Sequence, residues 1–306
     1  MSRNGSLTVQ VGGGIGNQLF GLVAGLWASR ELKCGLEVDV SAARPQNLAR
    51  AEVGHFAERD LELDSFPLPS AGDGSPVHLV ERSFRPPFRG EMRLRRTASR
   101  LRLPSREYWP TPWTVDERIL AVAQGRLLRG NFHTWGYWRR FCDLGGELAP
   151  DPLNPTEWFV EMSVLLEAAK PLALHVRLGD YTRVLPQLVS PLSFIEEALA
   201  EMEPLVGERP VWLFSDDPEA ALALVGTLRM RYDINALAPP LGSRAVESLS
   251  LMSRAAGIIC AASSFSIWAA QFAPPGKPVI LPQSAVSAFT QDGFRRDWIV
   301  LPSDGM

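Results

Sequence analysis

The sequence contains few cysteines. Cys34, Cys142 and Cys260 are the only three in 306 residues, and neither a CxxC pair nor a nearby histidine arrangement accompanies them. This spacing argues against a disulfide framework and against a zinc site of the usual ligand pattern. We therefore expect three buried thiols in a reducing compartment, and no bound metal.

A long uninterrupted apolar run is also missing. The most apolar stretch, residues 255–273, is interrupted by Gly257, by Gln271 and by three serines. It fits a strand followed by a helix better than a membrane span. The first residues lack the basic region and apolar run of a signal peptide. From these absences we expect a cytoplasmic protein.

The chain has no overall excess of positive charge. Its net charge is −3, whereas proteins that bind nucleic acid are usually basic, so we expect no nucleic-acid partner. The local exception runs from Arg82 to Arg106, where nine arginines accompany the single acid Glu91. Such a run is either a solvated surface segment or a peripheral contact with the anionic inner membrane.

What is present is a pattern of alternating strands and helices. Residues 7–11 predict a strand, residues 12–16 a glycine loop, residues 17–33 a helix with a wide apolar face, and residues 36–40 a second strand. This order is typical of the start of a Rossmann-like unit. Residues 44–106 are rich in Pro, Gly and Arg and predict irregular structure, and helical signals return between residues 115 and 148.

The second half repeats the pattern more regularly. Short apolar strands alternate with helices there, which predicts a parallel sheet buried on both faces. The predicted strands are residues 172–176, 211–214, 257–261 and 278–281, and the predicted helices are residues 191–202, 218–225, 244–256 and 265–272. A proline-rich linker at residues 148–155 separates the halves, so the sequence predicts an α/β protein with domains 1–150 and 151–306.

Polar residues follow three of the strands in the second half. In parallel α/β sheets, ligands bind beyond the carboxyl ends of the strands, so these side chains should meet at one edge. Each position also has a structural explanation, because acids and serines cap helices and a histidine within a strand can be a core residue. The residues are His175, Arg177, Gly179 and Asp180 after the first strand, Ser215, Asp216 and Asp217 after the second, and Ser263, Ser264 and Ser266 after the third.

Arg177 is the hardest of these to explain by structure alone. A guanidinium at the end of a buried strand requires an anionic partner, either an acid such as Asp180 or a bound phosphate. An arginine beside a serine-rich helix N-terminus can stabilise a diphosphate, and the growing charge of a diphosphate leaving group would make the same residues catalytic. The sequence therefore favours a sugar-nucleotide transferase that needs no metal.

The glycine loop is less specific. It lacks the Lys-Ser/Thr of a P-loop, and Asn17 stands where a dinucleotide fingerprint has its last glycine. Asp39, at the end of the next strand, does match the ribose-binding acid of a dinucleotide site. An NAD(P)-dependent oxidoreductase is thus an alternative, although it leaves the polar strand ends of the second half unexplained.

Several segments in this order resemble the motifs of the α-1,2-fucosyltransferases. Each motif alone is weak, and their common order along the chain makes the resemblance strong. The segments are residues 13–20 (GGIGNQLF), 175–181 (HVRLGDY), 214–218 (FSDDP), 249–253 (LSLMS) and 263–270 (SSFSIWAA).

The resemblance implies inverting, metal-independent transfer of L-fucose from GDP-fucose to a sugar hydroxyl, typically O-2 of a terminal galactose, without a further cofactor. It implies a GT-B-like pair of Rossmann-like domains facing a cleft, with the acceptor on the N-terminal and the GDP-sugar on the C-terminal side. Arg177 would hold the β-phosphate, and with His175 and Asn17 it forms the candidate catalytic set. The implied donor-binding residues are Gly14, Gly16, Asn17, His175, Arg177, Asp216, Glu247, Ser263, Ser264, Phe265 and Ser266.

On the acceptor side the resemblance implies Tyr137 and Trp138, from a Gly-Tyr-Trp stretch, together with Asp180. No carboxylate identifies itself as the general base. Asp180 lies close enough in sequence to Arg177 to orient it, and Glu247 and Asp39 are further candidates for the base.

The chain also departs from the family pattern. Leu178 replaces the usual second arginine, Ala262 replaces an asparagine, and Ile267 replaces one of two tryptophans. These changes keep Arg177 but leave the donor open, so a transferase for another GDP-sugar and a sugar-nucleotide-binding protein without turnover remain alternatives.

Overall fold

The computed structural model describes residues 5–43, 61–82, 94, 97, 107–111, 113–122, 125–130, 132–288, 295 and 297–303. The chain divides into two compact units with a boundary between Leu148 and Ala149, and residues 295 and 297–303 belong to the second unit. Nearly all of the arginine run lies outside the described residues, so the predicted membrane contact stays a prediction. Among the described helices, none has the length and apolar composition needed to cross a membrane.

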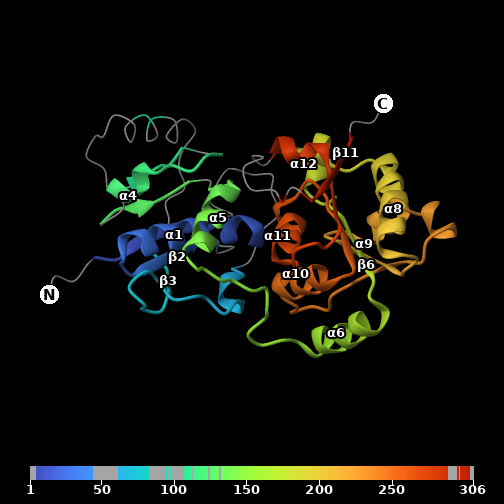
Figure 1. Ribbon diagram of the computed structural model, residues 1–306, viewed down its shortest axis with the longest axis horizontal. Coiled ribbons are helices and arrows are strands. Elements are labelled where there is room, and N and C mark those ends of the chain that lie inside the picture. Colours follow the sequence, from blue (N-terminus) through green and yellow to red (C-terminus); the bar gives the residue numbers. More distant parts are fainter. Residues whose placement is uncertain are drawn as a thin grey trace. The chain divides into compact units, whose positions relative to one another are not determined.

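The first unit is built on a five-stranded sheet with the order β3-β2-β1-β5-β4, in which every pairing is parallel (Figure 1). The strands are β1 (Leu7–Gly12), β2 (Leu36–Ala42), β3 (His78–Val80), β4 (Glu107–Tyr108) and β5 (Leu127–Leu128). The helices are α1 (Ile15–Leu32), α4 (Arg118–Val122) and α5 (Trp135–Asp143), with a 3-10 turn η1 (Leu63–Ser65).

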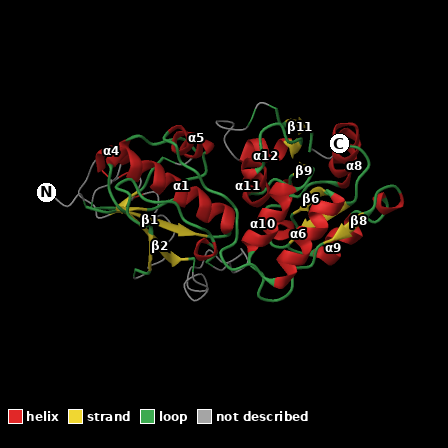
Figure 2. Ribbon diagram, turned by 60° about the horizontal axis from the view of Figure 1, so that its bottom comes forward, coloured by secondary structure: helices red, strands yellow, loops and turns green. Residues whose placement is uncertain are grey.

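The second unit contains a six-stranded parallel sheet with the order β11-β10-β9-β6-β7-β8, and its helices surround the strands (Figure 2). The strands are β6 (Leu172–Val176), β7 (Val211–Ser215), β8 (Ile234–Ala236), β9 (Gly257–Ile259), β10 (Val279–Pro282) and β11 (Ile299–Leu301). The helices are α6 (Glu157–Ala169), α7 (Tyr181–Val184), α8 (Leu192–Val206), α9 (Pro218–Leu224), α10 (Ala245–Arg254), α11 (Ser264–Phe272) and α12 (Gln283–Ala288), with 3-10 turns η2 (Pro186–Leu188) and η3 (Leu228–Met230).

The core of the second unit explains its regular sequence pattern. Side chains from β6, β7, α8 and neighbouring elements form one buried apolar cluster, with Leu174, Leu213 and Ala198 fully inaccessible to solvent. Burial of each of the two leucine side chains stabilises the fold by about 1.5 to 3 kcal/mol. Because strands covered on both faces must be apolar throughout, they stand out in the sequence.

Some elements differ from the predictions. The three-residue strands β8 and β11 lie at sheet edges and are too short to show a periodicity, and α6 exposes apolar residues such as Val164, which obscures its helical pattern. The predicted irregular segment contains β3, which pairs with β2. The prediction of three buried thiols was wrong for Cys142, which is exposed on the last turn of α5, whereas Cys34 and Cys260 are buried.

Candidate active site

The polar strand ends of the second unit meet at one edge of the sheet. Strand β6 lies between β9 and β7, so the segments that follow these three strands are neighbours. Arg177 after β6 reaches Asp216 after β7, with 2.9 Å between Nη1 and Oδ2. On the other side, the ring centroid of His175 lies 5.4 Å from that of Phe265 on α11. The edge therefore gathers an arginine, carboxylates and a helix N-terminus.

Arg177 is held by two carboxylates. Its Nη2 donates to Oδ1 of Asp180, and its Nη1 pairs with Asp216. The side chains of Arg177 and Asp216 keep 15% and 18% of their surface exposed, whereas Asp180 keeps only 4%. The Nε atom of Arg177 is buried and has no hydrogen-bond partner among the described residues. The guanidinium thus sits in a rigid carboxylate frame with donor capacity left over.

Gly179 makes this frame possible. Its φ of +23° lies in the region that favours glycine, and a Cβ atom there would lie 2.1 Å from Oδ2 of Asp216. Asp216 also accepts a hydrogen bond of 3.0 Å from the backbone N–H of Leu178 through Oδ1. Asp216 therefore ties the loop after β6 to the end of β7 through both carboxylate oxygens. The sequence alone did not indicate this role, because the resemblance gives Asp216 only as a donor-binding residue.

His175 is a buried, neutral imidazole. Burial, and secondarily the nearby charge of Arg177, lowers its pKa to about 3. Its Nδ1 is buried and finds no partner within the described part of the chain. Unpaired buried polar atoms cost free energy, and they concentrate where a ligand completes the hydrogen bonding. The unpaired Nδ1 distinguishes His175 from a fully satisfied core histidine, and its role in donor binding stays a prediction.

Helix α11 presents its N-terminus beside β6. Ser263 is the N-cap and accepts a hydrogen bond from the backbone N–H of Phe265, while Ser264 begins the helix. Ser266 is fully buried and donates to the carbonyl of Ala261 at 3.4 Å. Of the three predicted serines, Ser266 thus has a structural role inside the turn, and Ser263 and Ser264 lie at the helix end that attracts anions.

Glu247 lies on α10, away from these strand ends in the sequence, and is completely buried. Its carboxylate accepts hydrogen bonds from the backbone N–H of Thr156 at 2.6 Å and from the Thr156 hydroxyl at 3.0 Å. Thr156 is in turn the N-cap of α6. In this structure Glu247 therefore anchors the start of α6, and its oxygens are already engaged, which counts against the predicted roles of donor ligand and base.

The glycine loop of the first unit leads from β1 into α1. Gly14 is the N-cap of α1, Gly16 is buried in its first turn, and Asn17 is exposed one residue later. Gly13 has a φ of +72°, and a Cβ atom there would lie 2.8 Å from Nδ2 of Asn17. The loop therefore brings its backbone close to the Asn17 amide. The loop belongs to the first unit, and the Arg177 cluster belongs to the second.

Gln18 is a residue that the sequence analysis missed. It is fully buried, donates through Nε2 to the carbonyl of Gly13 at 2.8 Å, and accepts from the backbone N–H of Glu62 at 3.0 Å. Its carboxamide thereby holds the loop in place. The only signal for this role was its position within the segment GGIGNQLF.

Asp39 is a structural residue in this fold. It is 1% exposed and accepts hydrogen bonds from Nε2 of Gln10 at 2.9 Å and from the backbone N–H groups of Ser41 and Arg82 at 3.1 and 3.3 Å. A ribose-binding acid or a general base would have to be accessible to the ligand. The burial of Asp39 counts against both roles.

The two aromatic residues assigned to the acceptor behave differently. Tyr137 is 1% exposed, and its hydroxyl accepts the backbone N–H of Asp116 at 3.0 Å, so its ring belongs to the core of the first unit, which counts against the predicted acceptor-side role. Burial raises the pKa of the Tyr137 hydroxyl above the usual range.

Trp138 is half-buried, and its ring centroid lies 6.1 Å from that of Phe141. Asp180, also assigned to the acceptor side, pairs with Arg177.

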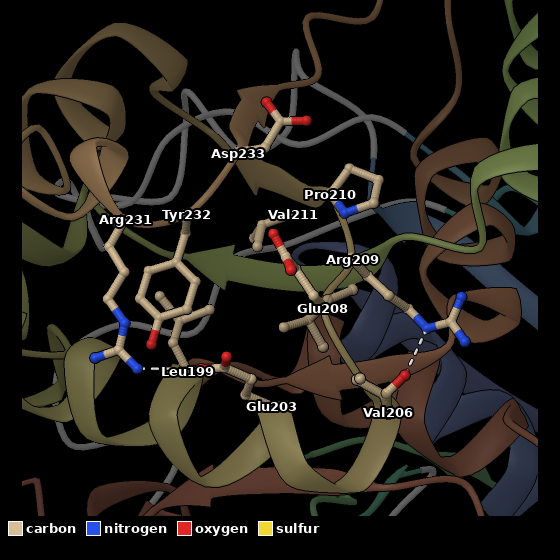
Figure 3. Close-up of a pocket in the computed structure, with 12 residues that line it drawn as sticks. Leu199, Glu203, Val206, Glu208, Arg209, Pro210, Val211, Arg231, Tyr232 and Asp233 are labelled. Atoms are coloured by element: carbon tan, nitrogen blue, oxygen red, sulfur yellow. Dashed lines mark hydrogen bonds and ion pairs between the residues drawn. The ribbon is translucent and has the colours of Figure 1, made fainter.

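A pocket of about 480 Å³ lies at the opposite edge of the second sheet (Figure 3). Leu172 and Val211, the first residues of β6 and β7, line it, so it opens at the amino ends of the strands that carry the Arg177 cluster on their carboxyl ends. Arg231 and Glu203 in its wall form an ion pair at 3.1 Å. Glu208, Arg209 and Asp233 also line the pocket, so its wall carries both signs of charge. In the part of the chain that the structure describes, no group of His, Cys, Asp and Glu side chains could hold a metal ion.

Residues 159–302 match Glycosyl transferase family 11, an α-fucosyltransferase family. The predicted resemblance is confirmed. The matched segment contains the Arg177 cluster, the loop after β7 and the start of α11, whereas the glycine loop of the first unit lies outside it. A search of the curated proteins finds no match.

Solved structures bear out the predicted GT-B-like class of this chain. The fucosyltransferase NodZ from Bradyrhizobium aligns with a TM-score of 0.51 and 16% identity, over 89% of this chain and 95% of that one. A NodZ alpha-1,6-fucosyltransferase co-crystallized with GDP gives the same TM-score and identity, over 89% and 94%. At this identity the likeness concerns the fold: two parallel α/β units of the GT-B-like kind.

Proposed function

We propose that the chain is an inverting fucosyltransferase that moves L-fucose from GDP-fucose to a sugar hydroxyl, and that the hydroxyl is O-2 of a terminal galactose in an oligosaccharide or surface glycan. The observation that carries the proposal is Arg177, at the carboxyl end of a central strand within a segment that matches a fucosyltransferase family. The fold likeness to fucosyltransferases supports it. The 2-linkage and galactose rest on the resemblance of the sequence motifs alone.

The proposed chemistry is a single displacement. The acceptor oxygen forms a bond to the anomeric carbon of fucose, the bond from that carbon to the β-phosphate oxygen breaks, and its electron pair leaves with GDP. The hydroxyl proton passes to a base. Charge grows on the departing phosphate, so Arg177 and the N–H groups at the start of α11 stabilise the transition state more than the ground state. Neither a metal ion nor a further cofactor is needed in this scheme.

Two alternatives differ in the ligand. Transfer of another GDP-sugar would use Arg177 in the same way, to bind the diphosphate. This alternative is suggested by Leu178, Ala262 and Ile267, which depart from the family pattern. An NAD(P)-dependent oxidoreductase would require a ribose-binding acid, and the carboxylate of Asp39 is instead occupied by Gln10 and Ser41. The second alternative is therefore the weaker one.

One assay separates these activities. The protein is incubated with GDP-fucose, GDP-mannose or NAD(P)H and a panel of galactose-terminated acceptors, with and without EDTA, while GDP release and product linkage are measured. We expect GDP release from GDP-fucose that survives EDTA and gives a 2-linked α-fucoside. GDP release from GDP-mannose and not from GDP-fucose would show that the protein uses a different donor sugar. Binding of GDP without release would indicate a binding protein, and NAD(P)H binding without GDP binding would overturn the proposal.

A further inference from the structure

We infer that Trp113 and His133 form an acceptor-sugar binding surface on the first unit. The inference rests on the proposed function in one respect, that the second substrate is a sugar. It differs from the motif-based expectation, which assigned the acceptor to Tyr137 and Trp138.

The topology brings these two residues to the ligand-binding edge of the first sheet. Trp113 follows β4 and His133 follows β5, and these strands are parallel neighbours. Strand β1, which leads into the glycine loop, pairs with the other side of β5. The segments after β1, β5 and β4 therefore emerge together at the carboxyl edge, where ligands of parallel α/β sheets bind.

Trp113 combines exposure with backbone strain. Its side chain is 40% exposed, and its φ is +67°, in the left-handed region that bulky residues rarely adopt. Such a conformation costs on the order of 1 to 3 kcal/mol and is typical of functional sites. An exposed tryptophan also lacks the benefit of full burial. A ring kept in this costly position offers a flat apolar face, which suits the C–H face of a sugar ring.

His133 supplies the polar group beside that ring. Its ring centroid lies 5.3 Å from that of Trp113 and 5.3 Å from that of Phe20 on α1, so it is packed between an exposed and a buried aromatic residue. Burial lowers the pKa of His133 to about 4, which keeps the imidazole neutral at physiological pH. A neutral imidazole places an edge of mixed donor and acceptor character beside the Trp113 ring without the desolvation cost of a buried charge.

Sugar binding can be measured without turnover. Saturation-transfer NMR on the full chain would use methyl glycosides and disaccharides that end in galactose, glucose, N-acetylglucosamine or mannose. The variants are Trp113→Ala, Trp113→Gly, which relieves the backbone strain while removing the ring, and His133→Phe, which keeps the aromatic packing. Trp158→Phe alters a half-buried tryptophan of the second unit and serves as the control.

We expect at least one glycoside to bind the wild type and the Trp158→Phe control, and to bind each of the other three variants at least ten-fold more weakly. GDP affinity and melting temperature should stay close to wild type in Trp113→Gly, which separates loss of binding from loss of fold. Where transfer is measurable, the acceptor KM should rise while the GDP-fucose KM does not.

Three outcomes would overturn the inference: no glycoside bound by the wild type, unchanged binding in both Trp113 variants, or loss of binding only on Trp138→Ala. Failure of the proposed function has a different signature. If glycoside binding depends on Trp113 but the protein transfers no fucose, the inferred sugar-binding surface stands and the proposed fucosyltransferase activity is wrong.

Discussion

Each unit holds an arginine paired with aspartate, and the two clusters differ in what remains unsatisfied. In the first unit, Asp116 accepts hydrogen bonds from the hydroxyl of Tyr108 at 2.9 Å, the backbone N–H of Thr111 at 2.9 Å, and Nε of Arg118 at 2.8 Å. In the second unit, Arg177 is surrounded by two carboxylates, and its Nε has no partner among the described residues.

The difference lies in which charge is enclosed. Asp116 is 3% exposed, whereas its partner Arg118 is 49% exposed, so the buried carboxylate is satisfied within the chain and the arginine extends toward water. At the other cluster the arginine is largely enclosed at the carboxyl edge of the sheet, and its Nε is unpaired among the described residues. The same pair of residue types therefore encloses the carboxylate in one place and the arginine in the other, and only the second arrangement fits the proposed phosphate site.

The largest effect is expected from removing the enclosed arginine. Arg177→Ala should abolish fucosyl transfer and lower GDP affinity about 100-fold or more, because charged hydrogen bonds contribute roughly 1.5 to 3 kcal/mol each. The melting temperature should fall, because Asp180 keeps only 4% of its side chain exposed and loses its charged partner, so GDP affinity is measured well below the melting temperature of the variant. Near wild-type turnover in this variant, measured by GDP release, would reject the phosphate assignment.

The matched change in the first unit should affect stability instead. Although burial raises the pKa of Asp116, hydrogen bonds from Arg118, the Thr111 backbone and Tyr108 lower it to about 2. A carboxylate with a lowered folded-state pKa stabilises the fold above its unfolded value near 3.8, and this contribution is lost as pH falls toward 2.

Asp116→Asn should therefore lower the free energy of unfolding by on the order of 2 kcal/mol at pH 7, with a smaller difference from wild type near pH 2. Denaturant unfolding at both pH values measures this. GDP affinity should be unchanged, and a loss of GDP binding in a folded Asp116→Asn protein would mean that the two clusters are not functionally distinct.

A smaller effect is expected from loosening the frame around Arg177. Asp216→Asn removes the charge that orients the guanidinium, and Gly179→Ala places a Cβ atom against the same carboxylate. Each should weaken GDP binding by about ten-fold, as for the loss of roughly one charged hydrogen bond. Calorimetry on the double variant should show less than the sum of the two effects, because both act through Asp216. Additive losses, or tighter GDP binding in Asp216→Asn, would contradict a positioning role.

The smallest effect concerns the neighbouring carboxylate. Asp217 caps α9 and accepts the backbone N–H of Ala220 at 3.1 Å, without an ion pair to Arg177. Asp217→Ala should cost about 1 kcal/mol of stability and leave GDP affinity intact. Thermal unfolding and GDP titration on the same sample would check both, and a GDP effect as large as that of Asp216→Asn would extend the site to this residue.

The sequence predicted the second unit well because its strands are apolar throughout and its polar residues follow the strand ends. The meeting of the segments that carry Arg177, Asp216 and Ser263 at one edge followed from that pattern. The direct ion pair between Arg177 and Asp216 did not, since the two residues lie 39 positions apart in the chain and only the pairing of β6 with β7 brings them together.

The first unit was harder to predict. Its strands β4 and β5 have two residues each, which is too short for a periodicity, so the positions of Trp113 and His133 after them could not be recognised. Tyr137 was chosen from its motif, and burial is invisible in such a pattern. Glu247 and Asp39 were chosen because acids are candidate bases, and their partners Thr156 and Gln10 appear only in three dimensions.

The most direct test of the central claim compares GDP with guanosine by isothermal titration calorimetry, in the wild type and in Arg177→Ala. If Arg177 holds the diphosphate, the wild type should bind GDP more tightly than guanosine by about 3 kcal/mol or more, and Arg177→Ala should lose most of that difference while its guanosine affinity is unchanged. An equal preference for GDP over guanosine in both proteins would contradict the account.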